Sequence, residues 1–214
     1  ASVDANKQLT QNDALLGRLN LVYKDADEFV DYSHSERAYV APAITWNIDS
    51  DTNFTLLSRY QRDEMSPWSP LPAYGTILPN PNGKIPVTFS VNDDNERAFY
   101  NQSSRQIGYE LRHRVSDAVS VSQNLRYERT KDTWNRWMFA DGISDDMTTI
   151  GRFYYGPTRH VTKDLGVDTR ANLVFETGPV RHAVLIGFDY LESKNTVSSD
   201  GLYDGRANPL RLFD

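Results

Sequence analysis

Large aromatic side chains gather in three stretches of the chain that are otherwise rich in polar residues and turn formers. An aromatic ring at the mouth of a pocket can stack on a compact ligand and hold it without a formal charge. The same rings can instead pack against one another and join neighbouring loops. The sequence leaves both alternatives open for each ring. The candidate ligand-binding residues are Trp68, Tyr74, Tyr100, Trp134, Trp137 and Phe139.

Residues that could support catalysis or bind a metal ion show no useful pattern. The four histidines are scattered, without the spacing of a metal site. Residues 49–53 resemble the start of a calcium-binding loop, but Phe54 stands where that loop needs Gly and Tyr60 where it needs Glu. The absence of cysteine excludes a disulfide, a thiolate zinc site and a cysteine nucleophile. We therefore expect no catalytic residue, no metal site, no cofactor and no enzymatic activity.

The composition narrows the class of protein. The 214 residues include 23 Lys and Arg against 29 Asp and Glu, a formal net charge of −6. That acidic balance argues against a nucleic-acid partner. The mean hydropathy is −0.60, and no apolar run approaches the length of a membrane helix. Because 12% of the residues are nonetheless aromatic, the chain fits either a soluble β protein or a piece of an outer-membrane barrel.

Apolar and polar residues alternate through most of the chain, which predicts strands with two different faces. In the clearest case Ile107, Tyr109 and Leu111 alternate with Glu110 and Arg112. No segment has a sustained helical period, so we expect almost no helix. The seven predicted strands are 14–25, 36–47, 52–63, 105–115, 119–132, 162–176 and 181–194.

The connections between the predicted strands alternate in length. Those at 47–51, 116–118 and 177–180 are short and have the composition of tight hairpins. The other connections are long, at 26–35, 64–104, 133–161 and from 195 onward. Short periplasmic turns at one rim and long extracellular loops at the other are the layout of an outer-membrane barrel. We therefore expect an all-β fold, with antiparallel up-and-down strands from a transmembrane outer-membrane β-barrel.

The two faces of the predicted strands also suit a barrel wall. Trp46 and Phe54 lie beside a short turn, whereas Tyr60, Tyr127 and Tyr190 lie toward the long loops, as in two interfacial aromatic girdles. The strand propensity of aromatic residues is the alternative explanation. The other face carries arginines that we expect to line the interior, where they could attract anionic ligands or pair with a plug domain. These are Arg59, Arg112, Arg114, Arg126 and Arg170.

Several motifs resemble one known family. Residues 36–46 (ERAYVAPAITW) are similar to a barrel strand of TonB-dependent siderophore receptors, and residues 51–58 follow them as in that family. Residues 71–76 (LPAYGT) and 81–86 (PNGKIP) resemble a loop of its ferric hydroxamate, or ferrichrome-type, branch. Residues 123–127 and 185–190 match later strands in the same order. The resemblance covers about residues 9–214.

The resemblance implies a barrel of about 22 strands, closed by an N-terminal plug domain, that takes ferric siderophores across the bacterial outer membrane with energy supplied through TonB. We expect residues 1–214 to be a partial barrel domain with about seven of those strands, lacking the plug domain and the C-terminal barrel strands. The implied partners are a ferric siderophore, the TonB complex through the missing plug, and outer-membrane lipid. By the same resemblance, Trp68 lies near a ligand-contacting aromatic residue of the third extracellular loop. Trp137 and Phe139 lie near paired tyrosines of the next loop.

Two other functions stay open from the sequence. One is a passive porin or a barrel that takes up another nutrient. The other is a soluble β-rich protein that binds carbohydrate through exposed Trp and Tyr side chains.

Overall fold

The computed structural model describes residues 1–66, 68–93, 98–199 and 205–213. These residues form two antiparallel β-sheets, and none of them forms an apolar helix long enough to cross a membrane. The strands are β1 (Ser2–Gln8), β2 (Leu15–Asp27), β3 (His34–Asn47), β4 (Thr52–Met65), β5 (Phe99–Ser116), β6 (Val119–Asn135), β7 (Trp137–Ile143), β8 (Thr149–Tyr155), β9 (Thr158–Thr177), β10 (Val180–Ser199) and β11 (Gly205–Arg211).

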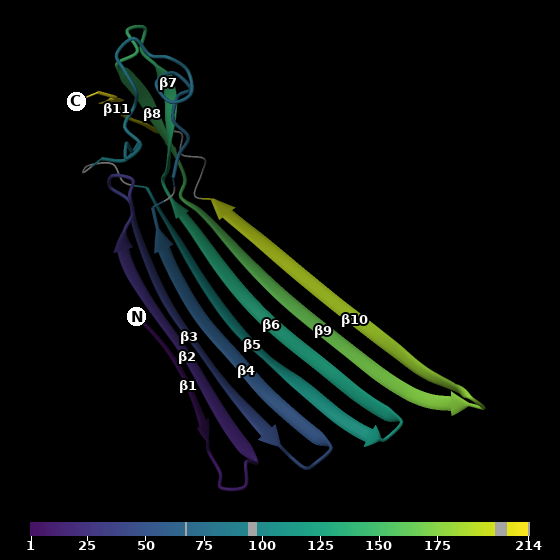
Figure 1. The fold of residues 1–214 in the computed structure, drawn as a ribbon. Helices are drawn as coiled ribbons and strands as arrows, with labels where there is room; N and C mark the ends of the chain where they lie inside the picture. Colours follow the sequence, from purple (N-terminus) through teal and green to yellow (C-terminus); the bar gives the residue numbers. More distant parts are fainter. Residues whose placement is uncertain (67, 94–97, 200–204, 214) are drawn as a thin grey trace.

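One large curved sheet contains eight strands in the order β1-β2-β3-β4-β5-β6-β9-β10 (Figure 1). Every pair of neighbours in it is antiparallel, so the chain runs up and down along the sheet. All seven predicted strands are present, as β2 to β6, β9 and β10, which confirms the all-β prediction. The sheet also gains β1, whose polar side chains are all exposed and give no clear alternation.

The register of this sheet separates an apolar face from a polar face. An unbroken apolar row crosses six strands through directly opposite residues, because strand alternation keeps them on one face. One residue further along each strand, a polar row crosses the same six strands on the other face. The apolar row is Ile44, Leu56, Tyr109, Leu125, Val167 and Tyr190, and the polar row is Thr45, Thr55, Glu110, Asn124, Asp168 and Asp189.

The five arginines predicted to share the polar face do so. Arg112 and Arg170 both lie opposite Ser122, and Arg126 lies opposite Gly108 and Gly166. Nη2 of Arg59 donates to Glu128 at 2.5 Å. Whether these arginines attract anionic ligands or pair with a plug stays a prediction.

The apolar face of the large sheet remains open. Ile107, Ile186 and Phe188 keep 53%, 60% and 66% of their surface exposed. Within the described part of the chain, the one cluster of buried apolar residues lies outside this sheet. An apolar face of this extent indicates contact with a membrane or another large apolar surface.

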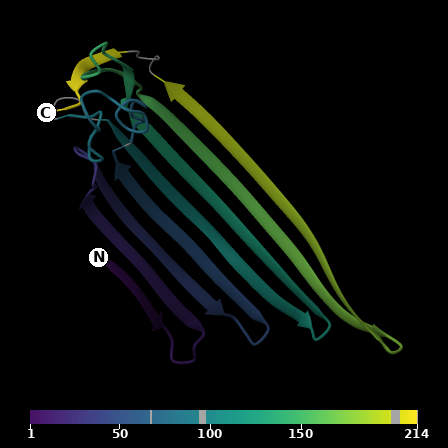
Figure 2. The same ribbon diagram turned by 45° about the horizontal axis from the view of Figure 1, so that its top comes forward.

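The connections differ in length between the two ends of the large sheet. The turns that join β3 to β4, β5 to β6 and β9 to β10 lie at one end with the β1–β2 connection (9–14), and the long connections 66–98 and 136–157 lie at the other end with the β2–β3 connection (28–33) (Figures 1 and 2). In the first turn Oδ1 of Asp49 accepts from the backbone N–H of Asp51 at 2.8 Å, so these residues form the polar hairpin turn that the sequence predicts.

A small folded unit at the long-loop end, here called the loop lobe, contains the second sheet, β11-β8-β7, and the segments 68–93 and 98 that pack on it (Figure 1). The sequence predicts loops at 133–161 and from 195 onward, but β7, β8 and β11 lie there and β10 extends to Ser199. These strands lack polar–apolar alternation because their sheet is covered on one face and carries aromatic rings on the other. The buried lobe core is Ile85, Val91, Ala98, Met138, Ile150, Ala207 and Leu212.

Candidate functional site

Four of the six predicted ligand-binding residues lie in one continuous stack of rings, here called the aromatic stack. The ring centroids of Tyr100 and Trp134 are 4.3 Å apart, and those of Trp134 and Trp137 are 4.4 Å apart and nearly parallel, at 8°. Phe139 follows at 5.2 Å from Trp137, and Phe153 at 5.1 Å from Phe139. All five side chains are half-buried. The rings therefore pack against each other and still present surface at the long-loop end.

Two pairs of strands position the stack. Tyr100 in β5 lies opposite Trp134 in β6, on the polar face of the large sheet. The β6–β9 ladder ends at the pair Trp134 and Thr158, and the β7–β8 ladder begins at the pair Trp137 and Tyr155. The hairpin β7–β8 is thus a bent continuation of the hairpin β6–β9.

The bend is made by residues in the left-handed backbone region. Arg136 has φ 57° and Gly156 has φ 121°. A Cβ atom on Gly156 would lie 3.1 Å from the carbonyl oxygen of Trp134, so a side chain there would crowd the backbone that carries the stack.

A carboxylate lies beneath the stack on the polar face. Oδ1 of Asp132 accepts from the Tyr100 hydroxyl at 2.6 Å and from Nε2 of Gln102 at 2.8 Å. Burial, and then the hydrogen bond to Asp132, raises the pKa of the Tyr100 phenol, which lies at the loop end of β5. The phenol therefore stays neutral and serves as a donor to a charged neighbour. Both donors to Asp132 are neutral, and no Lys or Arg within the described ranges forms an ion pair with it.

The neighbouring acidic residues of the polar face instead form ion pairs with arginines. Asp63 is buried and accepts from Nε of Arg37 at 2.5 Å and from Nε2 of Gln61 at 2.6 Å. Glu128 forms an ion pair with Arg59 and accepts a hydrogen bond from the hydroxyl of Ser104 at 2.6 Å. Asp132 is therefore the acidic residue next to the stack whose charge a ligand would meet.

The other two predicted residues do not join the stack. Trp68 is 79% exposed and borders a separate hollow of about 380 Å³ between the β2–β3 loop and the end of β4, with Phe29 and His34 on its rim. Tyr74 lies in a turn of the loop lobe and is also exposed. Their roles as ligand contacts stay predictions.

Sequence reasoning missed the residue that holds the lobe together. Arg152 in β8 is fully buried, with all three guanidinium nitrogens bonded. Nε donates to the carbonyl of Asn208 at 2.6 Å, Nη1 to the carbonyl of Val91 at 2.7 Å, and Nη2 to Asp93 at 2.8 Å. No local sequence signal marks an arginine as buried, because its partners are 56 to 61 residues away. Phe153, by contrast, was recognisable as one of the clustered aromatic residues.

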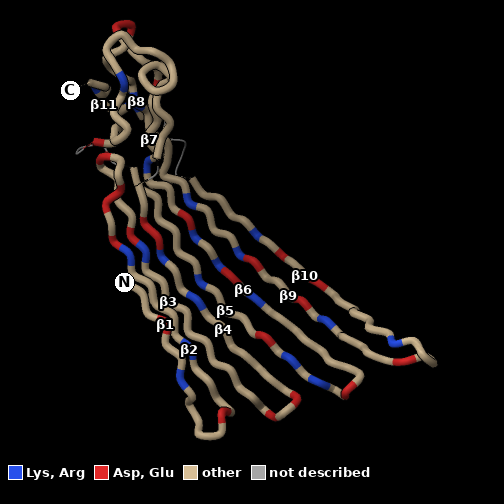
Figure 3. Tube along the Cα trace, in the orientation of Figure 1, with Lys and Arg blue, Asp and Glu red and all other residues tan. Residues whose placement is uncertain are grey.

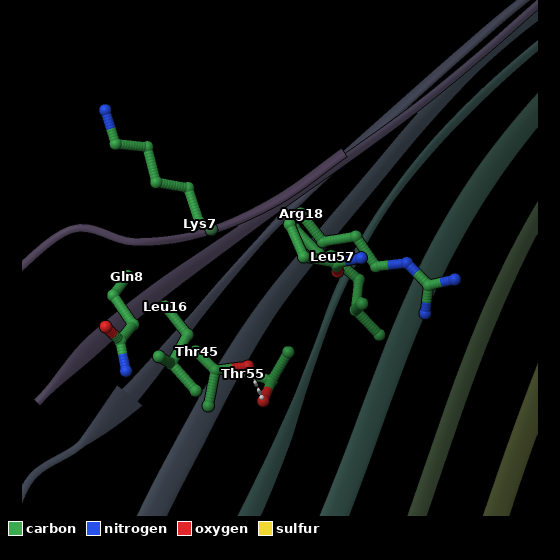
Figure 4. A pocket seen from close by; sticks show the side chains of 10 residues that line it. Lys7, Gln8, Leu16, Arg18, Thr45, Thr55 and Leu57 are labelled. Atoms are coloured by element: carbon green, nitrogen blue, oxygen red, sulfur yellow. Dashed lines mark hydrogen bonds between the residues drawn. The ribbon is translucent and has the colours of Figure 1, made fainter. Parts of the chain in front are cut away.

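A further hollow of about 490 Å³ lies on the polar face near the short turns and is shown in Figure 4. Arg18, Thr45 and Thr55 line it, and the two threonine hydroxyls are 2.9 Å apart. It is a shallow part of the sheet surface, far along the strands from the aromatic stack. We therefore do not assign it as the ligand site.

The comparisons with known sequences point to outer-membrane receptors. No family model matches the chain. The ferrichrome outer membrane transporter/phage receptor of Escherichia coli K12 is 30% identical over 200 residues, which cover 85% of this chain and 26% of that protein. The ferrioxamine B receptor of Salmonella typhimurium is 29% identical over 215 residues, which cover 100% of this chain and 30% of that protein. The chain thus spans between a quarter and a third of the length of these curated relatives.

Solved structures share the fold. The closed form of the ferric-catecholate import receptor Fiu from Escherichia coli K12 superposes with a TM-score of 0.83 at 16% identity, covering 99% of this chain and 32% of that chain. The ferripyoverdine receptor of Pseudomonas aeruginosa gives a TM-score of 0.79 at 17% identity, covering 96% of this chain and 28% of that chain. The large sheet is therefore similar to part of the wall of an outer-membrane receptor barrel.

Proposed function

We propose, from the premise that this chain is a segment of a TonB-dependent siderophore receptor, that the whole protein imports ferric siderophores across the bacterial outer membrane. In this proposal residues 1–214 belong to the barrel domain, and a plug domain and further strands complete it. Energy reaches the ligand site through TonB and the plug, which the arginines of the polar face help to hold. The resemblance of residues 71–76 and 81–86 to the hydroxamate branch favours a ferric hydroxamate.

The observation that carries the proposal is the aromatic stack at the long-loop end of the polar face. A ferric hydroxamate is compact and carries little charge, so stacked ring surface with a few hydrogen-bonding groups suits it. The stack supplies the ring surface, and Asp132, Tyr100 and Gln102 supply the polar groups. The stack stands where the interior of the barrel opens, so a ligand bound there lies at the entrance to the pore.

Removal of the central ring tests the site. In the full-length receptor, Trp137→Ala removes the ring between Trp134 and Phe139, and we expect the affinity for a ferric trihydroxamate to fall about tenfold, the size of a lost stacking interaction. Trp46→Ala, at the short-turn end on the apolar face, is the matched control and should leave affinity unchanged. Affinity is measured by quenching of intrinsic fluorescence as ligand is added.

Trp68→Ala separates the two possible locations. Unchanged affinity in Trp137→Ala together with a loss in Trp68→Ala would move the ligand to the hollow beside the β2–β3 loop. If the full-length wild-type protein binds no ferric siderophore but passes small solutes, the porin alternative is correct.

A further inference from the structure

The carboxylate of Asp132 has one oxygen that accepts hydrogen bonds and one that does not. The Tyr100 hydroxyl and Nε2 of Gln102 both donate to Oδ1, at 2.6 and 2.8 Å. Nε2 of Gln102 also lies 2.9 Å from the Tyr100 hydroxyl. Within the residues that the structure describes, no donor reaches Oδ2 of Asp132 or Oε1 of Gln102. Two acceptor oxygens on neighbouring strands therefore lack a donor.

Both oxygens are accessible and lie beside aromatic rings. Neither is among the buried, unpartnered side-chain atoms of the described chain, so both keep surface that a ligand can reach. Gln102 and Asp132 lie directly opposite each other on the polar face. The next pair on that face, toward the long-loop end, is Tyr100 and Trp134, whose rings are in contact. We call the two oxygens and these two rings the acceptor cradle.

The surroundings of the cradle leave the charge of Asp132 without compensation. Figure 3 shows acidic and basic positions next to one another in the loop-end half of the large sheet. The neighbouring acidic residues Asp63 and Glu128 are paired with arginines. The Arg136 guanidinium lies over an aromatic ring of the loop lobe, 5.0 Å from its centre. His160 lies opposite Asp132 in β9, and no hydrogen bond or ion pair joins the two in the described ranges.

These groups match the needs of a primary ammonium group. An ammonium group has three N–H donors and no acceptor, so it can use both free oxygens of the cradle. Its charge is attracted by a carboxylate and by the face of an aromatic ring. A neutral or anionic group in the same place would leave the negative charge of Asp132 uncompensated.

We propose that the acceptor cradle holds an ammonium group of the ligand. The substrate class is then a ferric hydroxamate with a cationic side chain, whose neutral iron-bearing core lies on the aromatic stack. This inference rests on the proposed function, because it assigns the charge of the ligand that binds there.

Three ferric complexes of one linear trihydroxamate test the proposal, because they differ only at the end of the chain. The end is a free primary amine, its N-acetyl form or its succinyl form. At about pH 8 these ends are positive, neutral and negative, and an imidazole is neutral. We expect the full-length receptor to bind the ammonium complex about fivefold more tightly than the N-acetyl complex, and the succinyl complex more weakly than either. Affinity is measured by quenching of intrinsic fluorescence.

Three variants assign this order of affinities to the cradle. Asp132→Asn should make the three affinities equal, while its amide oxygen can still accept from Tyr100 and Gln102. Asp132→Glu keeps the charge and should keep the order. Asp164→Asn is the matched control, since Asp164 lies on the polar face opposite Glu128, about 13 Å along the strands from Asp132, and it should also keep the order.

The outcomes separate this inference from the proposed function. Equal affinity of the wild type for all three complexes would overturn the inference alone. Failure of the wild type to bind any of them would contradict the proposed function and the inference with it. An order that survives Asp132→Asn, or that Asp164→Asn removes equally, would also overturn the inference, because the preference would then arise from the general negative charge of the polar face.

Discussion

Replacing Arg152 with Met should open the loop lobe without unfolding the barrel wall. Methionine fills much of the same volume but removes the hydrogen bonds that Arg152 donates to the carbonyls of Val91 and Asn208 and to the Asp93 carboxylate. Removing one partner of a buried charged pair costs about 3–5 kcal/mol. Asp93 is 23% exposed and can regain water, so we expect the lower value, about 3 kcal/mol.

The effect is local because the partners of Arg152 all lie in the lobe. Three kcal/mol corresponds to about a hundredfold change in the equilibrium between the closed and opened lobe. Hydrogen exchange of the full-length receptor, followed by mass spectrometry, should show about hundredfold faster exchange in peptides covering 85–93 and 205–213. Peptides from β5 and β6 should exchange as in the wild type.

Arg206→Met is the matched control, since Arg206 lies in the same small sheet but is exposed. It should leave exchange in both regions unchanged. Unchanged protection of the lobe in Arg152→Met would refute the reasoning, because it would mean that the apolar core alone holds the lobe. Equal loosening of β5 and β6 would refute it too, because the lobe would then not be an independent unit.

Two further predictions concern the charges around the site. Asp132→Asn should reduce the preference for a ferric trihydroxamate with a free terminal ammonium over its N-acetylated form by about fivefold, about 1 kcal/mol for a half-exposed pair. Asp189→Asn removes the same charge from the polar face away from the stack and should not change the ratio of the two dissociation constants. The turn between β7 and β8 should also depend on pH, because the Ser144 hydroxyl, followed by Thr148, lowers the pKa of Asp146 below its ordinary 3.8. This stabilisation is present above that ordinary value and is lost as the pH falls through the lowered folded-state pKa of Asp146. Hydrogen exchange of the turn, corrected for its intrinsic rate, should therefore speed up only in that pH range. Exchange that speeds up equally in Asp146→Asn would contradict this.

The barrel wall could be predicted from the sequence because each of its strands meets two different surroundings. Alternation such as that of Ile107, Tyr109 and Leu111 with Glu110 and Arg112 records those surroundings directly. The loop lobe lacked such a signal. In β8 the charged Arg152 is buried, whereas its neighbours Gly151 and Phe153 are only half-buried. This is the reverse of the usual pattern, in which the aromatic residue is buried and the charged one exposed.

The candidate site was predictable only in part. Residue type alone marked the aromatic residues as unusual, and four of the six that were singled out lie in the stack. Their order in the stack depends on pairing between residues far apart, such as Tyr100 and Trp134, and on the bend after β6. Trp68 had the same residue type and equally polar neighbours, so only the three-dimensional structure separates it from the stack.

The bend between Trp134 and Trp137 decides to which face of the strand each following side chain points, as well as the direction of the strand. Along a regular strand, side chains three positions apart point to opposite sides. Trp134 and Trp137 are three positions apart and yet stack face to face, and the left-handed Arg136 between them makes this possible. The returning strand makes the same step between Tyr155 and Thr158. A connection one residue shorter or longer would turn Met138 and Arg152 toward the mouth and the rings toward the lobe core. The number of residues in this connection thus decides which side chains lie exposed at the long-loop end of the sheet.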